Sequence, residues 1–346
     1  MLRHIDSCGD HYSYAQITRK WDAIGTGGQG SSSISSGNGR RSSNCIRFTN
    51  WSHPTWKVFD QQGTWIVGFA FKHDAHPSGN RHLVGVLDGS SHQCCVRFNL
   101  DGTVSAVRGD GGGTVLATSV ATFPISIFDY YEVKFVVHNT TGSIEVRKNG
   151  TTILTTGATN TRGGTANNSG ATIAFLHQGG TVGSAGLDLD DVYICDGQGS
   201  ANNDFLGDCR VDATFPNAEA STIEFTPSTG TDNSALVDDN PSNDDTDYVS
   251  SSTPGDHDLY DFPAIAPTAG SVFGVAVHIT ARKDDAGVRE IRDKIRQGGT
   301  TYDGTTVGIS TSYDMYTEIH EEDPDTSAPW TIAGVNSAEF GVELVS

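Results

Sequence analysis

The chain has 346 residues, of which 41 are glycine and 18% are charged, and its formal net charge is −20. This length allows two domains that each bury a core of their own. The abundance of Gly, Ser, Thr, Asn and Asp favours many short strands joined by turns over long helices. The negative charge argues against a nucleic-acid partner, because it would repel the phosphates.

The sequence has no run of 18 apolar residues, so we expect no insertion into a membrane. Its start, Met1–Cys8, lacks the apolar stretch of a secretory signal peptide, so export by the general secretory route is not expected. We therefore expect buried thiols and no structural disulfides. The one pair that we would test for a disulfide bond is Cys195 and Cys209. The other cysteines are Cys8, Cys45, Cys94 and Cys95.

The N-terminal region has aromatic and apolar residues at Tyr12, Tyr14, Ile17 and Trp21, which predict an opening strand. The low-complexity stretch Gly25–Gly39 comes next. It contains the pattern G-x-G-x-x-G, but a dinucleotide-binding motif needs a helix after it, and here serines follow. We therefore expect a loop.

Short strands separated by turn residues are predicted after this loop. The first of them are residues 45–48, 64–72, 83–87, 94–98, 103–107 and 115–118. The clearest pattern comes next, where Glu132–His138, Ser143–Lys148 and Thr151–Leu154 follow one another with alternating apolar residues. Asn149 and Gly150 separate the last two segments. An Asn-Gly pair favours a tight hairpin, because both central residues of that turn need a positive φ.

The arrangement from Tyr131 to Asp196 is a hairpin with this Asn-Gly turn, followed by an apolar strand over Leu187–Asp196. It resembles the last half of a laminin-G-like, concanavalin A-like β-sandwich, and the resemblance covers about residues 5–200. This resemblance implies a fold and no particular function, because the same sandwich occurs in lectins, glycanases and structural modules.

The composition of Gly197–Asp204 is that of a linker, and core-forming segments resume after it. Val288–Arg296 fits either a helical face or one face of a strand, and we predict a strand because a Gly-Gly turn and β-rich neighbours surround it. Other apolar segments lie at 205–211, 221–225, 259–262, 272–279, 313–319 and 340–345. The expected fold class is therefore all-β, with two β-sandwich, jelly-roll-like domains in tandem at residues 1–200 and 201–346.

Three longer segments carry a second resemblance. Asp190–Val211, Asp245–Ser252 and Trp330–Val342 resemble proteins encoded among the structural genes of tailed bacteriophages and prophages. The similarity extends over nearly the full length of the chain. It implies a virion component without an assigned activity, and it does not indicate which part of the virion.

Motifs for catalysis are missing from the sequence. Retaining glycanases of the concanavalin-like fold resemble one another in an E-x-D-x-x-E strand, which places two carboxylates about 5 Å apart. The nearest segment, Glu318–Asp323, has the wrong spacing and lies in the other domain. A G-x-S-x-G nucleophile motif is also absent. We therefore expect a protein that is not an enzyme.

Two kinds of metal site were considered. His73, His76 and His82 could bind zinc or copper, although a solvated loop is the simpler interpretation. An acidic cluster around Pro241 offers carboxylates for calcium, and its candidate ligands are Asp244, Asp245 and Asp247. A smaller acidic group is formed by Asp188, Asp190 and Asp191. Neither acidic group has the spacing of a known calcium loop, so solvated turns are the alternative. No cofactor is predicted, and calcium at the acidic cluster is the candidate retained.

Tryptophans can stack on sugar rings. Trp51 and Trp56 flank the loop segment Ser52–Thr55 and are the candidate carbohydrate-binding residues. Trp65 lies within an apolar segment and is expected in the core.

The combined expectation is a non-enzymatic virion protein, made in the host bacterial cytoplasm, that acts as a tail-associated appendage or fibre module. The first domain would bind a host surface glycan, and the second would dock on the particle or mediate oligomerisation. Expected partners are other virion proteins and further copies of the chain, with a trimer favoured. Two alternatives are a capsid decoration protein and a tail-attached glycan depolymerase. Copy number would separate tail from capsid, because decoration proteins are far more numerous on a particle.

Overall fold

The computed structural model describes residues 1–24, 32–48, 55–76, 79–120, 123–176, 186–265 and 270–346. Strands make up 46% of the chain and helices 5%, so the predicted all-β class is confirmed. The chain divides into two compact units, Met1–Val211 and Asp212–Ser346. The division therefore lies after Val211, whereas the sequence placed it after residue 200.

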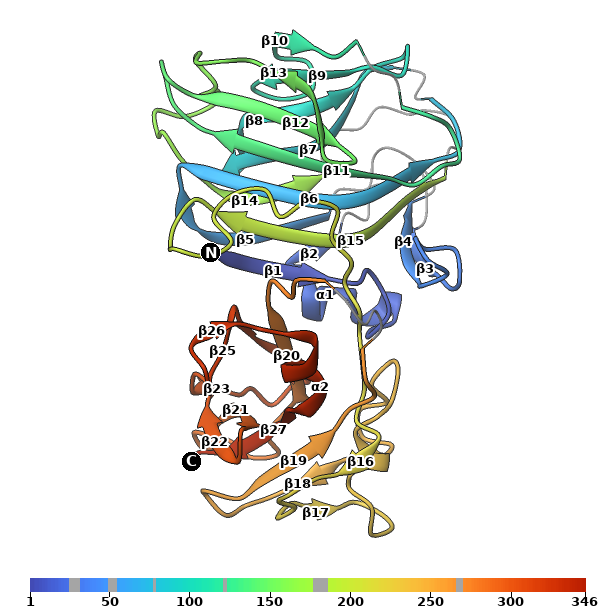
Figure 1. The fold of residues 1–346 in the computed structure, drawn as a ribbon, viewed down its shortest axis with the longest axis vertical. Helices are drawn as coiled ribbons and strands as arrows, with labels where there is room; N and C mark the ends of the chain where they lie inside the picture. Colours follow the sequence, from blue (N-terminus) through green and yellow to red (C-terminus); the bar gives the residue numbers. More distant parts are fainter. Residues whose placement is uncertain (25–31, 49–54, 77–78, 121–122, 177–185, 266–269) are drawn as a thin grey trace. The chain divides into compact units, whose positions relative to one another are not determined.

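The first unit is a sandwich of two antiparallel sheets (Figure 1). Its strands are β1 (Leu2–Asp6), β2 (Ala23–Ile24), β3 (Ser32–Ser35), β4 (Cys45–Phe48), β5 (Thr55–Gln62), β6 (Thr64–His73), β7 (Arg81–Asp88), β8 (Ser91–Phe98), β9 (Val104–Arg108), β10 (Thr114–Thr118), β11 (Asp129–Val136), β12 (Ser143–Lys148), β13 (Thr151–Thr155), β14 (Gly170–Phe175) and β15 (Leu187–Asp196). One sheet has the order β13-β12-β11-β6-β15-β4-β3, with β1 also paired to β15. The other has the order β10-β9-β8-β7-β14-β5-β2.

The interior of this sandwich is filled by aromatic side chains from both sheets. Trp65 on β6 donates its indole N–H to the carbonyl oxygen of Gly170 on β14 at 2.9 Å. Phe69 on β6 meets Phe175 on β14 edge to face, with ring centroids 5.2 Å apart. All three rings are at most 1% exposed. The core therefore lies between β6 and β14, and the expectation that Trp65 is a core residue is confirmed.

The hairpin predicted around Asn149-Gly150 is confirmed. Residue Asn149 has φ of 48° and Gly150 has φ of 76°, as a tight turn between β12 and β13 requires. The Asn149 side chain also accepts a hydrogen bond from the backbone N–H of Tyr130 and donates one to the carboxylate of Asp129, both at 2.8 Å. The turn is thus anchored to the start of β11.

The predicted opening strand over residues 12–21 is wrong. The first strand is β1, which pairs with β15, and the later residues form a 3-10 turn at Tyr14–Gln16 and the short helix α1 (Ile17–Lys20). The hydroxyl of Tyr12 and the indole N–H of Trp21 both donate to the carboxylate of Asp6, at 2.8 and 2.6 Å. These bonds fold the segment back onto the end of β1, which an extended strand would not allow.

The low-complexity stretch is only partly a loop. Ser32–Ser35, inside the predicted loop Gly25–Gly39, forms β3 and pairs with β4. Residues 25–31 lie outside the described residues. The serine-rich composition gave no apolar alternation from which to predict this strand. Its pairing with β4 depends on backbone hydrogen bonds, which serine forms as well as any apolar residue.

The predicted linker belongs to the first unit. Beyond Gly197–Asp204, the backbone N–H of Leu206 donates to the hydroxyl of Tyr193 at 3.1 Å. The N–H of Val211 donates to the carboxylate of Asp191 at 2.8 Å. These bonds to β15 hold the segment against its own sheet, and so the boundary moves to residue 211.

The cysteines of the described chain form no disulfide bond, and this includes the pair Cys195 and Cys209. Cys195 is 0% exposed, and so are Cys94 and Cys95 on β8. Burial raises the pKa of the Cys209 thiol to about 12, so this thiol is protonated near neutral pH. The expectation of buried thiols is confirmed for five of the six cysteines, and Cys209 is half-buried.

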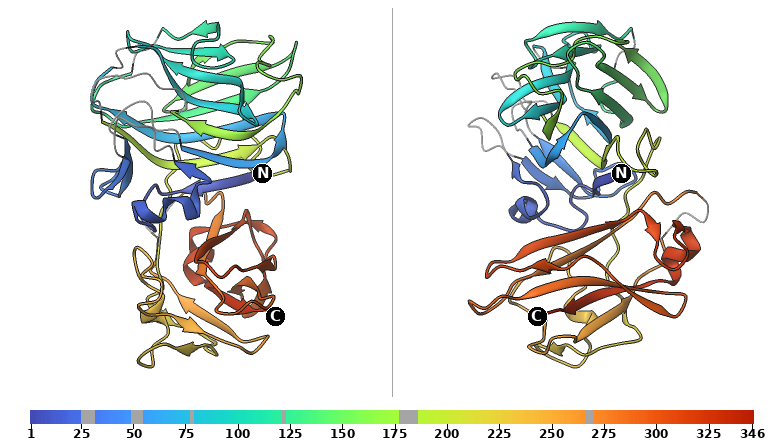
Figure 2. Two further views of the ribbon diagram at one scale, coloured as in Figure 1. Left: turned by 180° about the vertical axis from the view of Figure 1, so that it is seen from behind. Right: turned by 90° about the vertical axis from the view of Figure 1, so that its left-hand side faces the viewer.

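The second unit has a smaller set of strands arranged in two layers. They are β16 (Ala218–Glu219), β17 (Thr226–Pro227), β18 (Val249–Ser250), β19 (His257–Asp261), β20 (Val275–Ala281), β21 (Glu290–Gln297), β22 (Thr300–Asp303), β23 (Val307–Gly308), β24 (Asp314–His320), β25 (Glu322–Asp323), β26 (Ala328–Pro329) and β27 (Glu339–Leu344). One sheet has the order β16-β19-β27-β21-β22, with β23 also paired to β21, and β20 pairs separately with β24. The views in Figure 2 follow these strands from two further sides.

The core of the second unit is formed by Ile295, Trp330, Ala338 and Phe340. The residues packed against it include Val275 and Val277 of β20, so the β20–β24 pair covers one face of the larger sheet. The strand prediction for Val288–Arg296 is confirmed by β21, in which Ile291 and Ile295 are at most 4% exposed. The helix α2 (Ile332–Ser337) is capped at its N-terminus by Thr331, whose hydroxyl accepts a hydrogen bond from the backbone N–H of Gly334.

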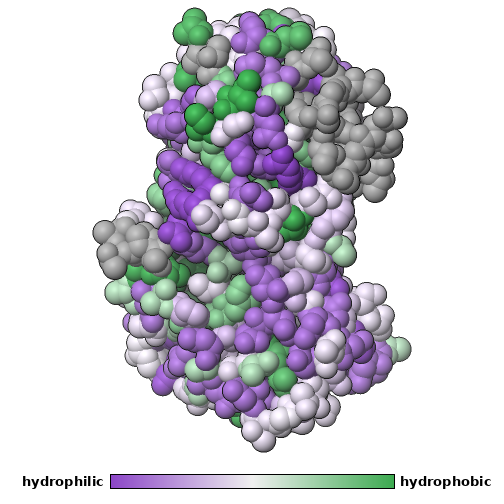
Figure 3. Space-filling view, turned by 90° about the vertical axis from the view of Figure 1, so that its right-hand side faces the viewer, coloured by the Kyte–Doolittle hydropathy of each residue, from purple (hydrophilic) through white to green (hydrophobic). Residues whose placement is uncertain are grey.

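None of the helices in the described residues has the length and hydropathy needed to cross a bilayer. On the face drawn in Figure 3, hydrophobic residues are scattered among hydrophilic ones and form no continuous apolar surface in its coloured part.

Candidate functional site

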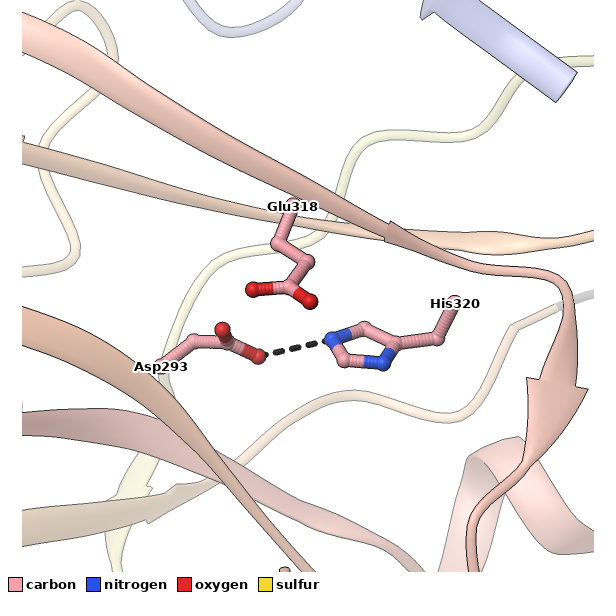
Figure 4. A group of neighbouring side chains, drawn as sticks. All are labelled: Asp293, Glu318 and His320. Atoms are coloured by element: carbon pink, nitrogen blue, oxygen red, sulfur yellow. Dashed lines mark hydrogen bonds and ion pairs between the residues drawn. The ribbon is translucent and has the colours of Figure 1, made fainter. Parts of the chain in front are cut away.

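Three ligand-type side chains converge in the second unit (Figure 4). Asp293 extends from β21, and Glu318 and His320 extend from β24. One ligand atom from each residue lies within 4.8 Å of the others. Nε2 of His320 is hydrogen-bonded to Oδ2 of Asp293 at 2.7 Å. Two carboxylates and an imidazole thus meet between the two layers of this unit.

Strand alternation explains why these polar groups point inward. Asp293 lies between Ile291 and Ile295, which share its face of β21, and it is 3% exposed. On β24, Glu318 and His320 stand opposite Val277 and Val275 of β20, which pack against the core. Opposed residues in an antiparallel pair share a face, so both side chains point toward the same apolar interior.

Neighbouring groups fix the Glu318 carboxylate and the end of β24. The hydroxyl of Thr305 donates to Oε1 of Glu318 at 2.9 Å, and the backbone N–H of Thr305 donates to Oε2. The indole N–H of Trp330 donates to the backbone oxygen of His320 at 3.1 Å. These contacts orient the Glu318 carboxylate and hold the backbone at His320.

A glycine is needed beside the cluster. A Cβ placed on Gly304 would lie 1.8 Å from Oδ1 of Asp293 and 2.8 Å from Oε2 of Glu318. The backbone N–H of Gly304 also donates to the backbone oxygen of Asp293 at 2.9 Å. The loop after β22 therefore approaches both carboxylates closely, and a side chain at this position would displace them.

The charge balance of the cluster is unusual for buried carboxylates. In the described part of the chain, neither Asp293 nor Glu318 forms an ion pair with a lysine or an arginine, and the His320 imidazole is the basic group that contacts Asp293. The nearby Glu343 is bound instead by both Arg292 and Lys294. Two carboxylates held this close repel one another unless a proton or a cation lies between them.

The sequence contained a weak signal for this cluster. The segment Glu318–Asp323 was considered for its carboxylates and rejected because the spacing does not fit a glycanase. Glu318 and His320 are two residues apart, so a strand places both on one face. Their third member, Asp293, is far away in sequence and could not be assigned to the group without the pairing of the strands.

The candidate carbohydrate-binding residues have different outcomes. Trp51 lies outside the described residues. Trp56 is on β5, is half-buried, and pairs in register with Ala174 of β14 and Ala23 of β2. Val58 shares its face of the strand and is 49% exposed. This face of β5 is therefore reached by solvent, and glycan binding at Trp56 stays a prediction.

The predicted calcium ligands do not converge in the described residues. Asp245 pairs with Arg282 at 2.9 Å and accepts a hydrogen bond from the Tyr313 hydroxyl at 3.0 Å. Asp247 accepts a bond from the Asn243 amide at 2.7 Å. Asp244 accepts one from the Ser242 hydroxyl at 3.3 Å. Calcium at this turn therefore stays a prediction.

The three histidines suggested as zinc or copper ligands do not form one group. His73 lies against His76, whereas His82 lies against a fourth histidine, His92. Nε2 of His73 and Nδ1 of His76 are 3.2 Å apart, and burial together with His76 lowers the pKa of His73 to about 4. His82 instead lies against His92, with ring centroids 5.2 Å apart. The solvated-loop interpretation is also wrong for His73, which is 1% exposed.

The acidic group on β15 is part of the fold. Asp188 is ion-paired with Arg47 and Lys72 at 2.9 and 2.8 Å. Burial, and secondarily the charge of Asp191, raises the pKa of Asp190 to about 7. Asp190 accepts hydrogen bonds from the Arg40 backbone N–H and the Ser43 hydroxyl. These carboxylates are bound by protein donors and are not arranged around a cation.

Comparisons with known proteins assign no family. No family profile matches the chain, and no curated protein matches it. Among solved structures, a sialidase matches 56% of this chain and 18% of its own, at 12% identity and a TM-score of 0.42. Trypanosoma rangeli sialidase in complex with the inhibitor DANA matches 55% of this chain and 29% of its own, at 12% identity and a TM-score of 0.35. A carbohydrate-binding module from Bacillus subtilis matches 47% of this chain and 90% of its own, at 8% identity and a TM-score of 0.30. The chain thus spans less than a third of these sialidases, and similarity this low assigns no activity.

Proposed function

We propose that this chain is a non-enzymatic structural protein of a tailed-phage virion, located in a tail appendage, whose first unit binds a glycan of the host surface. The proposal rests on the sequence resemblance to tailed-phage structural proteins and on one observation in the first unit. The described acidic side chains buried on β15 are committed to ion pairs and hydrogen bonds, while β5 leaves Trp56 and Val58 partly exposed on one face.

The ion-paired and hydrogen-bonded carboxylates of β15 favour glycan binding over glycan hydrolysis as the function of the first unit. A retaining glycosidase needs one carboxylate as nucleophile and a second as acid, about 5 Å apart and open to the sugar. Asp188 and Asp196 have side chains at most 1% exposed and are each neutralised by cations. A carboxylate in a buried ion pair is held away from the substrate, so these residues stabilise the sandwich.

The partly exposed aromatic on β5 supports a glycan ligand. Sugar rings present C–H faces that pack well on an indole, and a tryptophan has both the area and a polar N–H to serve this role. Trp56 lies between small neighbours, Ala174 and Ala23, on the strands at each side. Flat neighbours leave room for a ring to lie along the strand.

The direct test is a glycan array of bacterial surface polysaccharides probed with the purified full chain, followed by calorimetry on any ligand found. Trp56→Ala should weaken binding by about tenfold or more, since stacking of a ring on an aromatic contributes about 1–3 kcal/mol. Tyr248→Ala is the matched control, because Tyr248 is 42% exposed in the second unit. Equal binding by wild type and Trp56→Ala would refute the assignment of this residue.

Location in the particle is tested separately. Quantitative mass spectrometry of purified virions should find a low copy number, in a multiple of three for the favoured trimer. A copy number comparable to that of the capsid protein would indicate capsid decoration instead. Release of reducing ends from a polysaccharide by the purified chain would overturn the non-enzymatic assignment.

A further inference from the structure

We propose that Asp293, Glu318 and His320 form a binding site for one divalent transition-metal ion of the zinc class. This site is independent of glycan binding and of the place of the chain in a virion. The ion would connect the larger sheet of the second unit, through β21, to the separate β20–β24 pair.

The first argument is ligand type. Zinc binds imidazole nitrogen and carboxylate oxygen, and three protein ligands leave a fourth position for water. Calcium needs six to eight oxygens, and two carboxylates supply too few. An imidazole in the ligand set favours zinc and its neighbours over calcium or magnesium.

The second argument concerns the charge of the two carboxylates. Asp293 is 3% exposed, and its side chain is hydrogen-bonded through Oδ2 to His320. The other oxygen, Oδ1, lies beside the Gly304 backbone, where a Cβ on Gly304 would come within 1.8 Å of it and within 2.8 Å of Oε2 of Glu318. Two carboxylates this close, without a lysine or arginine partner in the described residues, repel one another, and a bound cation would neutralise them.

The third argument is distance. Zinc-to-ligand bonds of about 2.1 Å in a tetrahedron place ligand atoms about 3.4 Å apart. The three ligand atoms here lie within 4.8 Å, and the Asp293–His320 pair lies at 2.7 Å, the separation of a hydrogen bond. Replacing the proton of that bond by an ion needs small side-chain movements only. Thr305 already holds Glu318 in place.

The experiment titrates the tag-free, chelator-treated full chain with zinc chloride by calorimetry. We expect one site with micromolar or tighter affinity in the wild type. Glu318→Gln and His320→Gln should each weaken this site by about 10–100-fold, because each removes one of three ligands. Saturating zinc should also raise the melting temperature of the second unit by about 5–10 °C, as ligand binding to the native state alone requires.

Two control variants identify the site. Glu322→Gln alters an exposed carboxylate close in sequence to His320, and His76→Gln alters the close pair of His73 and His76 in the first unit. Neither should change the affinity. If the calorimetric site is unaffected by Glu318→Gln and His320→Gln, or is lost in His76→Gln, the proposal is wrong.

Hydrogen exchange of the wild type gives a readout that does not depend on variant folding. Zinc should slow amide exchange in Glu290–Gln297 and Asp314–His320 and leave β6 of the first unit unchanged. Calcium at the same concentration should have no such effect. Zinc-dependent protection confined to other strands would overturn the proposal.

Discussion

The strands β15 and β20 show how differently the two units are built. All ten residues of Leu187–Asp196 are buried, because β15 lies inside its sheet between β6 and β4 and is covered by the second sheet. All seven residues of Val275–Ala281 are only half-buried, because β20 has a single strand partner, β24. The central strand β15 is therefore enclosed on both faces, whereas β20 is only partly enclosed.

This difference in burial explains why the acidic residues of β15 need partners of opposite charge. β15 carries several carboxylates, and a buried carboxylate must be neutralised or protonated. Asp188 is paired with Arg47 and Lys72, while Asp196 is paired with Arg3 and the chain N-terminus. The second unit has less apolar area to stabilise it, so bonds between its layers should matter more there.

Core truncation should give the largest difference between the units. Phe69→Ala removes a fully buried ring from the first unit and should lower its free energy of unfolding by about 3–5 kcal/mol. Val277→Ala removes a half-buried side chain from the second unit and should cost about 1–2 kcal/mol. Denaturant unfolding followed by hydrogen exchange measures both. Equal losses would show that the second core is as dense as the first.

Removal of a buried charge should have the next largest effect. Asp188→Asn leaves Arg47 and Lys72 without their common partner and should cost about 2–4 kcal/mol in the first unit. Asp245→Asn breaks the exposed pair with Arg282 in the second unit and should produce no measurable change. Urea titrations of both variants test this contrast. A large loss from Asp245→Asn would mean that the turn depends on that carboxylate.

The sequence predicted strands correctly where the signals lay within a few neighbouring residues. Alternation and Asn149-Gly150 predicted the hairpin, because both signals are local. The opening strand was wrong because Asp6 attracts Tyr12 and Trp21 through hydrogen bonds that no periodicity reports. The boundary was expected at residue 200 because the turn-rich composition of Gly197–Asp204 gives no sign that the backbone N–H groups of Leu206 and Val211, just after it, bind β15.

The candidate site was beyond sequence reasoning for a topological reason. Asp293 and His320 belong to different sheets, and only the packing of those sheets brings them to 2.7 Å. An acidic, histidine-containing strand such as Glu318–His320 is also common on surfaces. Its inward direction depends on the valines opposite it on β20.

The stability of the two units should also depend differently on pH. Burial raises the pKa of Asp190 to about 7, above its value near 4 in an unfolded chain. The folded state then holds a proton that the unfolded state releases, so this stabilisation is complete below about pH 4 and is lost as pH rises to about 7. Over that range the wild type should lose on the order of 1–3 kcal/mol relative to Asp190→Asn.

Unfolding of the first unit at intervals between pH 4 and 8 measures this difference. Subtracting the curve of Asp190→Asn from that of the wild type removes the titration of the other carboxylates. A constant difference between the two proteins across this range would contradict a raised pKa for Asp190. Asp188→Asn is a poor control, because it also breaks an ion pair.

The smallest effect should come from turn glycines, and it should be the same in both units. Gly150 and Gly230 have φ of 76° and 68°, and a Cβ on either would contact nothing within 4 Å. Alanine at each position should therefore cost about 1 kcal/mol, the penalty of the left-handed conformation alone. Gly308 also has open space but an ordinary φ, so Gly308→Ala should be neutral or slightly stabilising. Denaturant titrations of the three variants test this equality. If Gly230→Ala lowers the free energy of unfolding much more than Gly150→Ala does, the lower stability of the second unit comes from its turns. Equal losses would indicate that it comes from the packing between its layers.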